Sequence, residues 1–214
     1  MTEPADFIRS NSALIAPPLV PEVRLYLATE VVPLWRKTEE ELEKEGVPPP
    51  YWAFAWAGGQ ALARYVLDNP ETVRGRTVLD FGSGSGLVAV AAAKAGASQV
   101  LAADIDAFAA AAIALNAEAN DARVAVTTDD VIGRDGAWQT ILVGDMCYER
   151  PLAERLLLWL QDRKRCGALV LLGDPGRTYF PKSGVEKLAT YNVQTTRDLE
   201  DREIRETSVY SLVA

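Results

Sequence analysis

The chain has 214 residues and a formal net charge of −8, which gives a sequence pI near 4.7. This length suits one α/β domain with a substantial core, and an acidic surface disfavours nucleic acid as a partner. The absence of histidine excludes histidine general bases, Ser-His-Asp triads and histidine-ligated metals. Two cysteines are too few for a zinc site, so we expect no bound metal.

The N-terminal part of the sequence carries no targeting signal that we can identify. Its first residues are acidic and polar, without the apolar stretch of a signal peptide, and no apolar run reaches transmembrane length. Two cysteines without framework spacing fit free thiols in a reducing compartment. We therefore expect a cytoplasmic protein that does not bind membranes.

Residues 1–50 are expected to form an extension that packs on the domain formed by residues 51–214. Prolines interrupt the extension. The stretch 23–35 has a mixed pattern that fits either a strand or a short helix. The charged run 38–45 favours a solvated helix with pairs four residues apart, such as Glu40 with Lys44.

An aromatic stretch, PYWAFAWAGGQ at residues 50–60, leads into an alanine-rich helix at about 58–67. Aromatic side chains at this density are more often core than cofactor wall. However, Trp52 and Trp56 lie where a lid over the following glycine turn would begin. Both readings of Trp56 stay open: a core residue, or a contact to cofactor or substrate.

The sequence TVLDFGSGSG at residues 77–86 predicts a buried strand, 77–81, that runs into a glycine turn and then a helix, 86–95. This geometry brings backbone N–H groups and a helix N-terminus close to a ligand. The next strand, 99–104, ends on Asp104 about 20 residues further on, where a carboxylate can hold ribose hydroxyls. The G-x-G-x-G spacing differs from the G-x-G-x-x-G of dinucleotide-dependent oxidoreductases, which argues against that class.

The remaining elements alternate. We expect strands at about 122–127, 139–144, 167–173, 190–196 and 206–213, and helices at about 106–119, 151–164 and 181–189. Alternation predicts a parallel sheet with helices on both faces, and the short link between the last two strands predicts an antiparallel last strand. Asn116 and Asn120 share a helix face and are expected to brace a neighbouring loop.

Acidic residues follow two of these strands. Asp129 and Asp130 could accept a hydrogen bond from an adenine amino group, or could cap a helix that begins at Val131. The loop DMCYE after strand 139–144 carries Asp145, Tyr148 and Glu149, at an edge where open α/β sheets bind ligands. The alternative is that this loop has only a structural role, as the N-cap of a helix that begins near Pro151.

These motifs resemble known families. VLDFGSGSG followed by LAADID is similar to the seven-stranded S-adenosylmethionine-dependent methyltransferases. The D-x-x-Y of DMCY resembles a group of protein-lysine methyltransferases, and the Pro-Pro-aromatic motif of enzymes that methylate nucleic-acid amino groups is absent from this loop. PPPYWAFAWAGGQALARYVLDNP and GDPGRTYFP resemble the electron-transfer flavoprotein β-subunit lysine methyltransferases, over nearly all of residues 50–214.

The resemblance implies a Rossmann-like sheet in the order 3-2-1-4-5-7-6 with strand 7 antiparallel, and S-adenosyl-L-methionine as cofactor. It implies a lysine methyltransferase that acts on the flavoprotein β-subunit, and we expect this enzyme to be a monomer. Other candidates are a methyltransferase for another protein such as a ribosomal protein, one for a small molecule, or a binding protein without turnover. The residues expected at the catalytic centre are Asp145, Tyr148 and Glu149, and those expected to bind cofactor are Trp56, Asp80, Gly82, Ser83, Gly84, Gly86, Asp104, Ile105, Asp129 and Asp130.

Overall fold

The computed structural model describes residues 3–29, 49–195 and 204–213. The N-terminal residues form helix α1 (Pro4–Asn11) and an antiparallel pair of short strands, β1 (Ala13–Ile15) and β2 (Leu25–Leu27). They pack on helix α6 (Ala107–Ala119), where Phe7 meets Phe108 edge to face at 5.5 Å between ring centroids. The predicted helix at 38–45 lies outside the described residues. The division into extension and domain stays a prediction.

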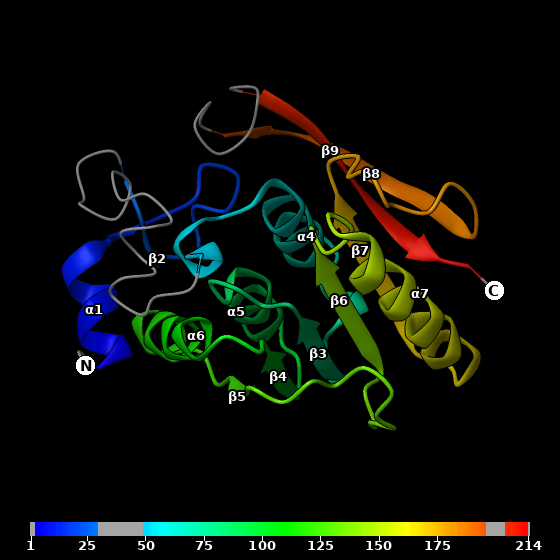
Figure 1. The fold of residues 1–214 in the computed structure, drawn as a ribbon, viewed down its shortest axis with the longest axis horizontal. Helices are drawn as coiled ribbons and strands as arrows, with labels where there is room; N and C mark the ends of the chain where they lie inside the picture. The colour runs from blue at the N-terminus through cyan, green and yellow to red at the C-terminus, as the bar shows by residue number, and fades with distance from the viewer. Residues whose placement is uncertain (1–2, 30–48, 196–203, 214) are drawn as a thin grey trace.

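A seven-stranded sheet forms the centre of the molecule (Figure 1). Its strands are β3 (Thr77–Phe81), β4 (Gln99–Ala103), β5 (Ala125–Thr127), β6 (Thr140–Gly144), β7 (Leu169–Asp174), β8 (Val185–Gln194) and β9 (Ile204–Leu212). The spatial order is β5-β4-β3-β6-β7-β9-β8; the first five strands pair in parallel, and β9 is antiparallel to both neighbours. The predicted order and the predicted antiparallel last strand are confirmed.

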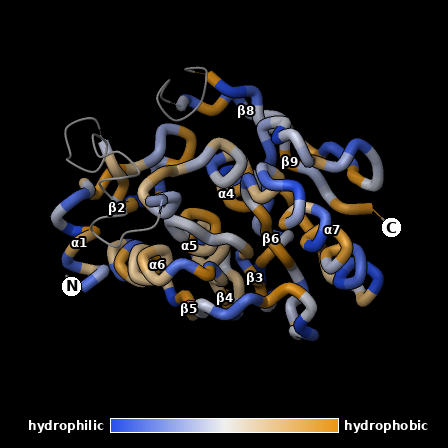
Figure 2. Tube along the Cα trace, in the orientation of Figure 1, coloured by the Kyte–Doolittle hydropathy of each residue, from blue (hydrophilic) through white to orange (hydrophobic). Residues whose placement is uncertain are grey.

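Helices cover both faces of the sheet, as expected from the alternation. Helices α4 (Ala57–Asp68), α5 (Leu87–Lys94) and α6 contribute to the core on one face, and α7 (Arg150–Arg165) packs on the other. Short 3-10 turns, η1 (Tyr51–Ala53) and η2 (Pro70–Thr72), flank α4. Figure 2 shows the central strands as largely hydrophobic, while α7 also carries hydrophilic stretches. Among the described residues, no helix has the length and apolar character to cross a membrane.

The predicted helix at 181–189 is wrong. Gly184 turns the chain with φ of 75°, and β8 then begins at Val185 and pairs with β9 over its whole length. The Glu-Lys-Leu-Ala run favours a helix locally, but pairing with β9 satisfies the backbone in an extended form. Strand propensity depends on such neighbours more than helix propensity does, and a register shift between Lys187 and Ala189 further blurs the alternation.

Candidate active site

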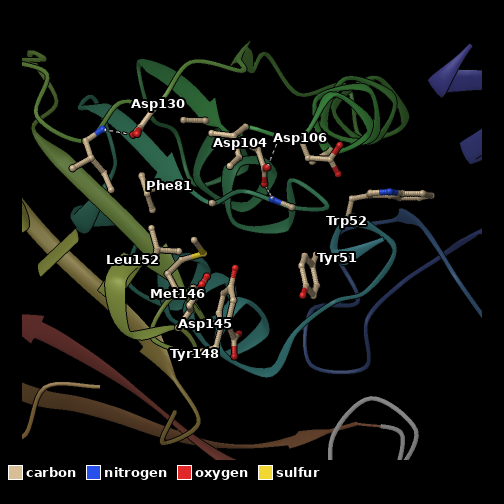
Figure 3. A pocket seen from close by; sticks show the side chains of 18 of the residues that line it. Tyr51, Trp52, Phe81, Asp104, Asp106, Asp130, Asp145, Met146, Tyr148 and Leu152 are labelled. Atoms are coloured by element: carbon tan, nitrogen blue, oxygen red, sulfur yellow. Dashed lines mark hydrogen bonds between the residues drawn. The ribbon is translucent and has the colours of Figure 1, made fainter. Parts of the chain in front are cut away.

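The carboxyl ends of β3, β4 and β6 border a cavity of ≈ 680 Å³ (Figure 3), a volume typical of small-molecule sites, roughly 300–1,000 Å³. The structure brings most of the predicted site residues to this one cavity; Asp80, Ser83 and Gly86 are outside its lining. The predicted residues in the lining are Trp56, Gly82, Gly84, Asp104, Ile105, Asp129, Asp130, Asp145, Tyr148 and Glu149.

The glycine turn follows β3 directly and borders the cavity. Gly82 and Gly84 have φ of 62° and 53°, a backbone conformation that glycine adopts without steric cost. A Cβ on Gly82 would lie 2.3 Å from Met146 Sδ, so this glycine also lets the loop after β6 approach the turn. Gly86 packs against Ile113 of α6, away from the cavity.

Asp80 stabilises the glycine turn through hydrogen bonds. Its carboxylate accepts hydrogen bonds from Ser83 Oγ at 2.5 Å and from the backbone N–H of Ala89 at 3.0 Å. Burial raises the pKa of Asp80 to about 7. Asp80 and Ser83 line a smaller hollow beside the main cavity, and their contact with a cofactor stays a prediction.

Asp104 lies at the end of β4, on the wall of the cavity. It accepts from the backbone N–H groups of Gly84 at 2.9 Å and Asp106 at 3.1 Å, and burial raises its pKa. Each carboxylate oxygen has a further lone pair, so two hydroxyl groups of a ligand could still bind there. Ile105 beside it is 78% exposed and lines the same wall.

Asp129 and Asp130 follow β5 and also line the cavity. Asp130 accepts from the backbone N–H of Ile132 at 3.0 Å and pairs with Arg155, while Asp129 pairs with Arg134. The residues after Asp130 form a turn instead of a helix, so the predicted helix cap is wrong. Adenine recognition by these residues stays a prediction.

Sequence reasoning missed the apolar wall of the cavity. The residues come from four separate segments, and none was singled out as a binding residue by a motif, so only the fold brings them together. They are Phe81, Val131, Ile132, Met146 and Leu152.

The side chain of Asp145 is held by Gly59 and Arg177. Its backbone is left-handed with φ of 58°, a conformation that few non-glycine residues adopt. Its Oδ2 accepts from the backbone N–H of Gly59 at 3.0 Å, in the first turn of α4, and its Oδ1 accepts from Arg177 Nε at 3.1 Å and Nη2 at 2.8 Å. The carboxylate therefore lies between a helix N-terminus and a guanidinium, both of which stabilise its negative charge.

Three aromatic rings line the cavity together with Asp145. The Tyr51 ring lies 6.1 Å from Trp56 and 6.1 Å from Tyr148, between centroids, and Figure 3 shows Tyr51 and Tyr148 among the side chains that line the cavity. Trp56 Nε1 donates to the carbonyl oxygen of Tyr51 at 2.9 Å, and the guanidinium of Arg177 lies 5.7 Å from the Trp56 ring centroid. Trp56 thus lines the cavity. Glu149 is exposed at the start of α7 and makes no side-chain cap, so the predicted cap does not form at this residue.

Asn116 and Asn120 brace loops, as predicted. Asn116 Nδ2 donates to the carbonyl oxygen of Ser85 at 2.8 Å, and its Oδ1 accepts from the backbone N–H of Tyr26 at 2.7 Å. Asn120 binds both backbone polar groups of Arg24. The fully buried Asn116 therefore ties the glycine turn to the N-terminal segment.

Comparison with known proteins identifies the family. Over 98% of this chain, the sequence is 42% identical to "Electron transfer flavoprotein beta subunit lysine methyltransferase" of Xenopus laevis, and it covers 87% of that protein. The Danio rerio protein of the same name is 44% identical over 85% of this chain, which covers 71% of it. The chain belongs to the electron transfer flavoprotein beta subunit lysine methyltransferase family.

Other matches agree with a methyltransferase fold. Residues 60–142 match the family model described as "Ribosomal protein L11 methyltransferase (PrmA)". The solved structure of magnesium protoporphyrin IX methyltransferase from Synechocystis with bound SAM shares the fold, with a TM-score of 0.54 at 14% identity over 73% of this chain and 78% of that one. Within the family, this chain is an S-adenosyl-L-methionine-dependent protein-lysine methyltransferase.

The cavity fits S-adenosyl-L-methionine. Glycines that leave room for close backbone approach border one side, and the Asp104 carboxylate offers acceptor positions to paired hydroxyls. Apolar residues after β5 suit a flat heterocycle. When bound, this cofactor supplies an electrophilic methyl group.

Proposed function

We propose that this enzyme methylates lysine side chains on the β-subunit of electron transfer flavoprotein. Two kinds of observation support the substrate. Relatives that carry this activity in their names match most of the chain. The rings of Tyr51, Trp56 and Tyr148 also line the same cavity as the carboxylate of Asp145.

The aromatic lining beside Asp145 is the observation that carries the proposal. A lysine side chain is a long aliphatic stem with a terminal amine, so it suits a passage with apolar ring faces and a polar end. Ring faces also attract cationic ammonium groups. A substrate lysine would lie along the rings of Tyr51 and Tyr148 and bring its nitrogen towards Asp145.

The chain's own groups then orient the amine. Asp145 accepts its hydrogens, and the Tyr148 phenol stays protonated because burial raises its pKa, so it can donate to or accept from the amine. The proton of the ammonium leaves to solvent, which frees the nitrogen lone pair for the methyl group that bound S-adenosyl-L-methionine would supply. Alignment of the reacting atoms is the main contribution expected from the protein.

The remaining parts of the proposal concern the cofactor and the setting. Asp104 would accept from ribose hydroxyls, and Asp129 or Asp130 from the adenine amino group; Glu149 would contact the substrate. We propose a monomer that acts in the cytoplasm, with neither nucleic acid nor membrane as partner. The net charge of −8 favours a lysine-bearing protein segment over a polyphosphate.

The test combines purified enzyme, S-adenosyl-L-methionine and recombinant electron transfer flavoprotein from the same organism. Intact-mass spectrometry should show mass gains in steps of one methyl on the β-subunit. Replacing the modified lysines with arginine should abolish the gains. An unmodified β-subunit, alongside methylation of a different protein in lysate, would contradict the substrate and leave the methyltransferase activity standing.

A ribosomal protein is the second candidate substrate. Its support is the PrmA match and a 28% identity to the "Ribosomal protein L11 methyltransferase" of an Exiguobacterium strain, over 84% of this chain and 58% of that protein. The PrmA match ends at residue 142, before Asp145, Tyr148 and Arg177. The match therefore covers the part of the chain proposed to bind cofactor and gives little information about the substrate. The lysate experiment described above separates the two candidate substrates.

A further inference from the structure

Arg177 is placed where the substrate amine must arrive. It follows β7 in a turn that Asp174 builds: Asp174 Oδ1 accepts from the backbone N–H groups of Gly176 and Arg177, both at 2.7 Å. The Arg177 side chain is 18% exposed, lines the cavity, pairs with the 9% exposed side chain of Asp145, and lies over the Trp56 ring. A turn held by the buried Asp174, an ion pair and an aromatic face thus fix one guanidinium beside the proposed amine site.

This arrangement has an electrostatic consequence for the reaction. A lysine amine attacks only in its neutral form, and its unperturbed pKa is about 10.4. A partly buried carboxylate beside the amine favours the charged ammonium, whereas a fixed positive charge nearby favours the neutral amine. Asp145 alone would therefore bind the substrate well and keep it unreactive.

We propose that Arg177 is a positioning residue with two roles. It holds Asp145 as an acceptor and, through its permanent positive charge, keeps the substrate amine in the neutral form. This inference rests on the proposed function, in which a lysine approaches Asp145. Arginine suits both roles because its guanidinium stays charged at any working pH and its planar fork grips one carboxylate through two bonds.

Other ionisable groups surround this pair, and in the described part of the chain those closest in sequence and structure are acids, phenols and a thiol. Asp174 at the end of β7 is a second carboxylate whose pKa is raised to about 6, mainly by burial. Asp80 and Asp104 add further carboxylates on the glycine-turn side. The loop after β6 contributes Cys147, Tyr148 and Glu149, and η1 contributes Tyr51; burial raises the pKa of Cys147 to about 12. Arg155, which also lines the cavity, pairs with Asp130 after β5.

The experiment compares Arg177→Gln with Arg177→Lys. The rate of methyl transfer to the flavoprotein β-subunit is measured between about pH 7.5 and 10.5, where carboxylates are largely ionised. Arg177→Gln should move the midpoint of the kcat profile by about one pH unit towards alkaline pH, at the low end of the ~1–3 units that a neighbouring charge produces. At pH below the midpoint this is about a tenfold loss, recovered at high pH. Arg177→Lys keeps the charge and should keep the wild-type midpoint, with a lower kcat because the fork is lost.

A second measurement makes the test independent of the variant's maximal rate. Aminoethylcysteine in place of the target lysine has an amine that loses its proton at lower pH. With this substrate, Arg177→Gln should recover most of its lost methyl-transfer rate, whereas Arg177→Lys should recover less. Binding of S-adenosylhomocysteine and the melting temperature report that each variant is folded. If Arg177→Gln does not fold, Arg177→Met, which can pack on Trp56, makes the same neutral test.

The outcomes separate the two proposals. Equal midpoints in both variants and wild type, or equal shifts in Gln and Lys, would overturn the electrostatic role assigned to Arg177. Wild-type enzyme that methylates no lysine on the flavoprotein would overturn the proposed substrate instead.

Discussion

Replacement of Asp145 by asparagine tests whether the buried network around this residue is built for catalysis. Asparagine has nearly the same shape and tolerates the left-handed backbone, but it keeps only one acceptor oxygen. That oxygen can serve either Arg177 or the backbone N–H of Gly59, and the new NH₂ group then faces the other donor. The variant therefore loses at least one charge-assisted interaction and leaves a buried donor unpaired.

The magnitude follows from these contacts. Hydrogen bonds to charged groups contribute about 1.5–3 kcal/mol each, and a buried unsatisfied group costs about 1–3 kcal/mol. Relief of the carboxylate's own desolvation offsets part of this, so we expect a net loss of about 3 kcal/mol. For a chain of this size, that corresponds to a melting temperature lower by roughly 6–12 °C. Methyl transfer should fall on the order of a hundredfold, as for a misplaced reactant, while cofactor affinity stays near wild type.

Asp68→Asn is the matched control. Asp68 also pairs with an arginine, Arg64 at 2.6 Å, but its side chain is 49% exposed, and exposed pairs contribute less than about 1 kcal/mol. Thermal unfolding, calorimetric titration with S-adenosyl-L-methionine and a methyl-transfer assay compare both variants. If Asp145→Asn melts like Asp68→Asn, the energetic reasoning fails; if it binds cofactor and retains full turnover, Asp145 has no catalytic role.

Three further predictions concern the parts around this network. Gly58→Ala should lower stability by about 1–3 kcal/mol and reduce turnover, because its Cβ would lie 2.2 Å from the Gly173 carbonyl oxygen; Gly59→Ala, with 4.0 Å to its nearest neighbour, is the folded control in the same denaturation assay. Asp104→Ala should weaken cofactor binding in calorimetry by about 2 kcal/mol, and unchanged affinity would remove it from the site. Asp80 has a folded-state pKa of about 7 against an ordinary 3.8, so its contribution to the free energy of unfolding falls by up to ~4 kcal/mol as pH rises from about 4 to 7. Urea titrations at several pH values should show a smaller decline of this free energy for Asp80→Asn than for wild type. An equal decline in both proteins would argue against the raised pKa of Asp80.

The glycine turn could be predicted because its signal is local, whereas the strand order was implied by the resemblance to the seven-stranded methyltransferases. TVLDFGSGSG contains a buried strand and the glycines that a tight turn requires, and an apolar helix follows in the same continuous run. Alternating strands and helices leave few topologies that obey the handedness and connection rules. The position of Asp104 near the glycine turn was also predictable, because the carboxyl ends of neighbouring parallel strands lie at the same edge of the sheet.

What the sequence alone determined was therefore the fold class, the glycine turn and the loop that carries Asp145 and Tyr148. Tertiary structure decided the rest, since it depends on contacts between distant residues. Pairing with β9 made 185–194 a strand against its local helix preference. Packing of α4 against β6 and β7 brought the Gly59 N–H to Asp145, 86 residues away in the chain, and the turn after β7 brought Arg177 to it across 32 residues. Such contacts have no sequence signature, because the geometry that makes them favourable exists only once the sheet has formed.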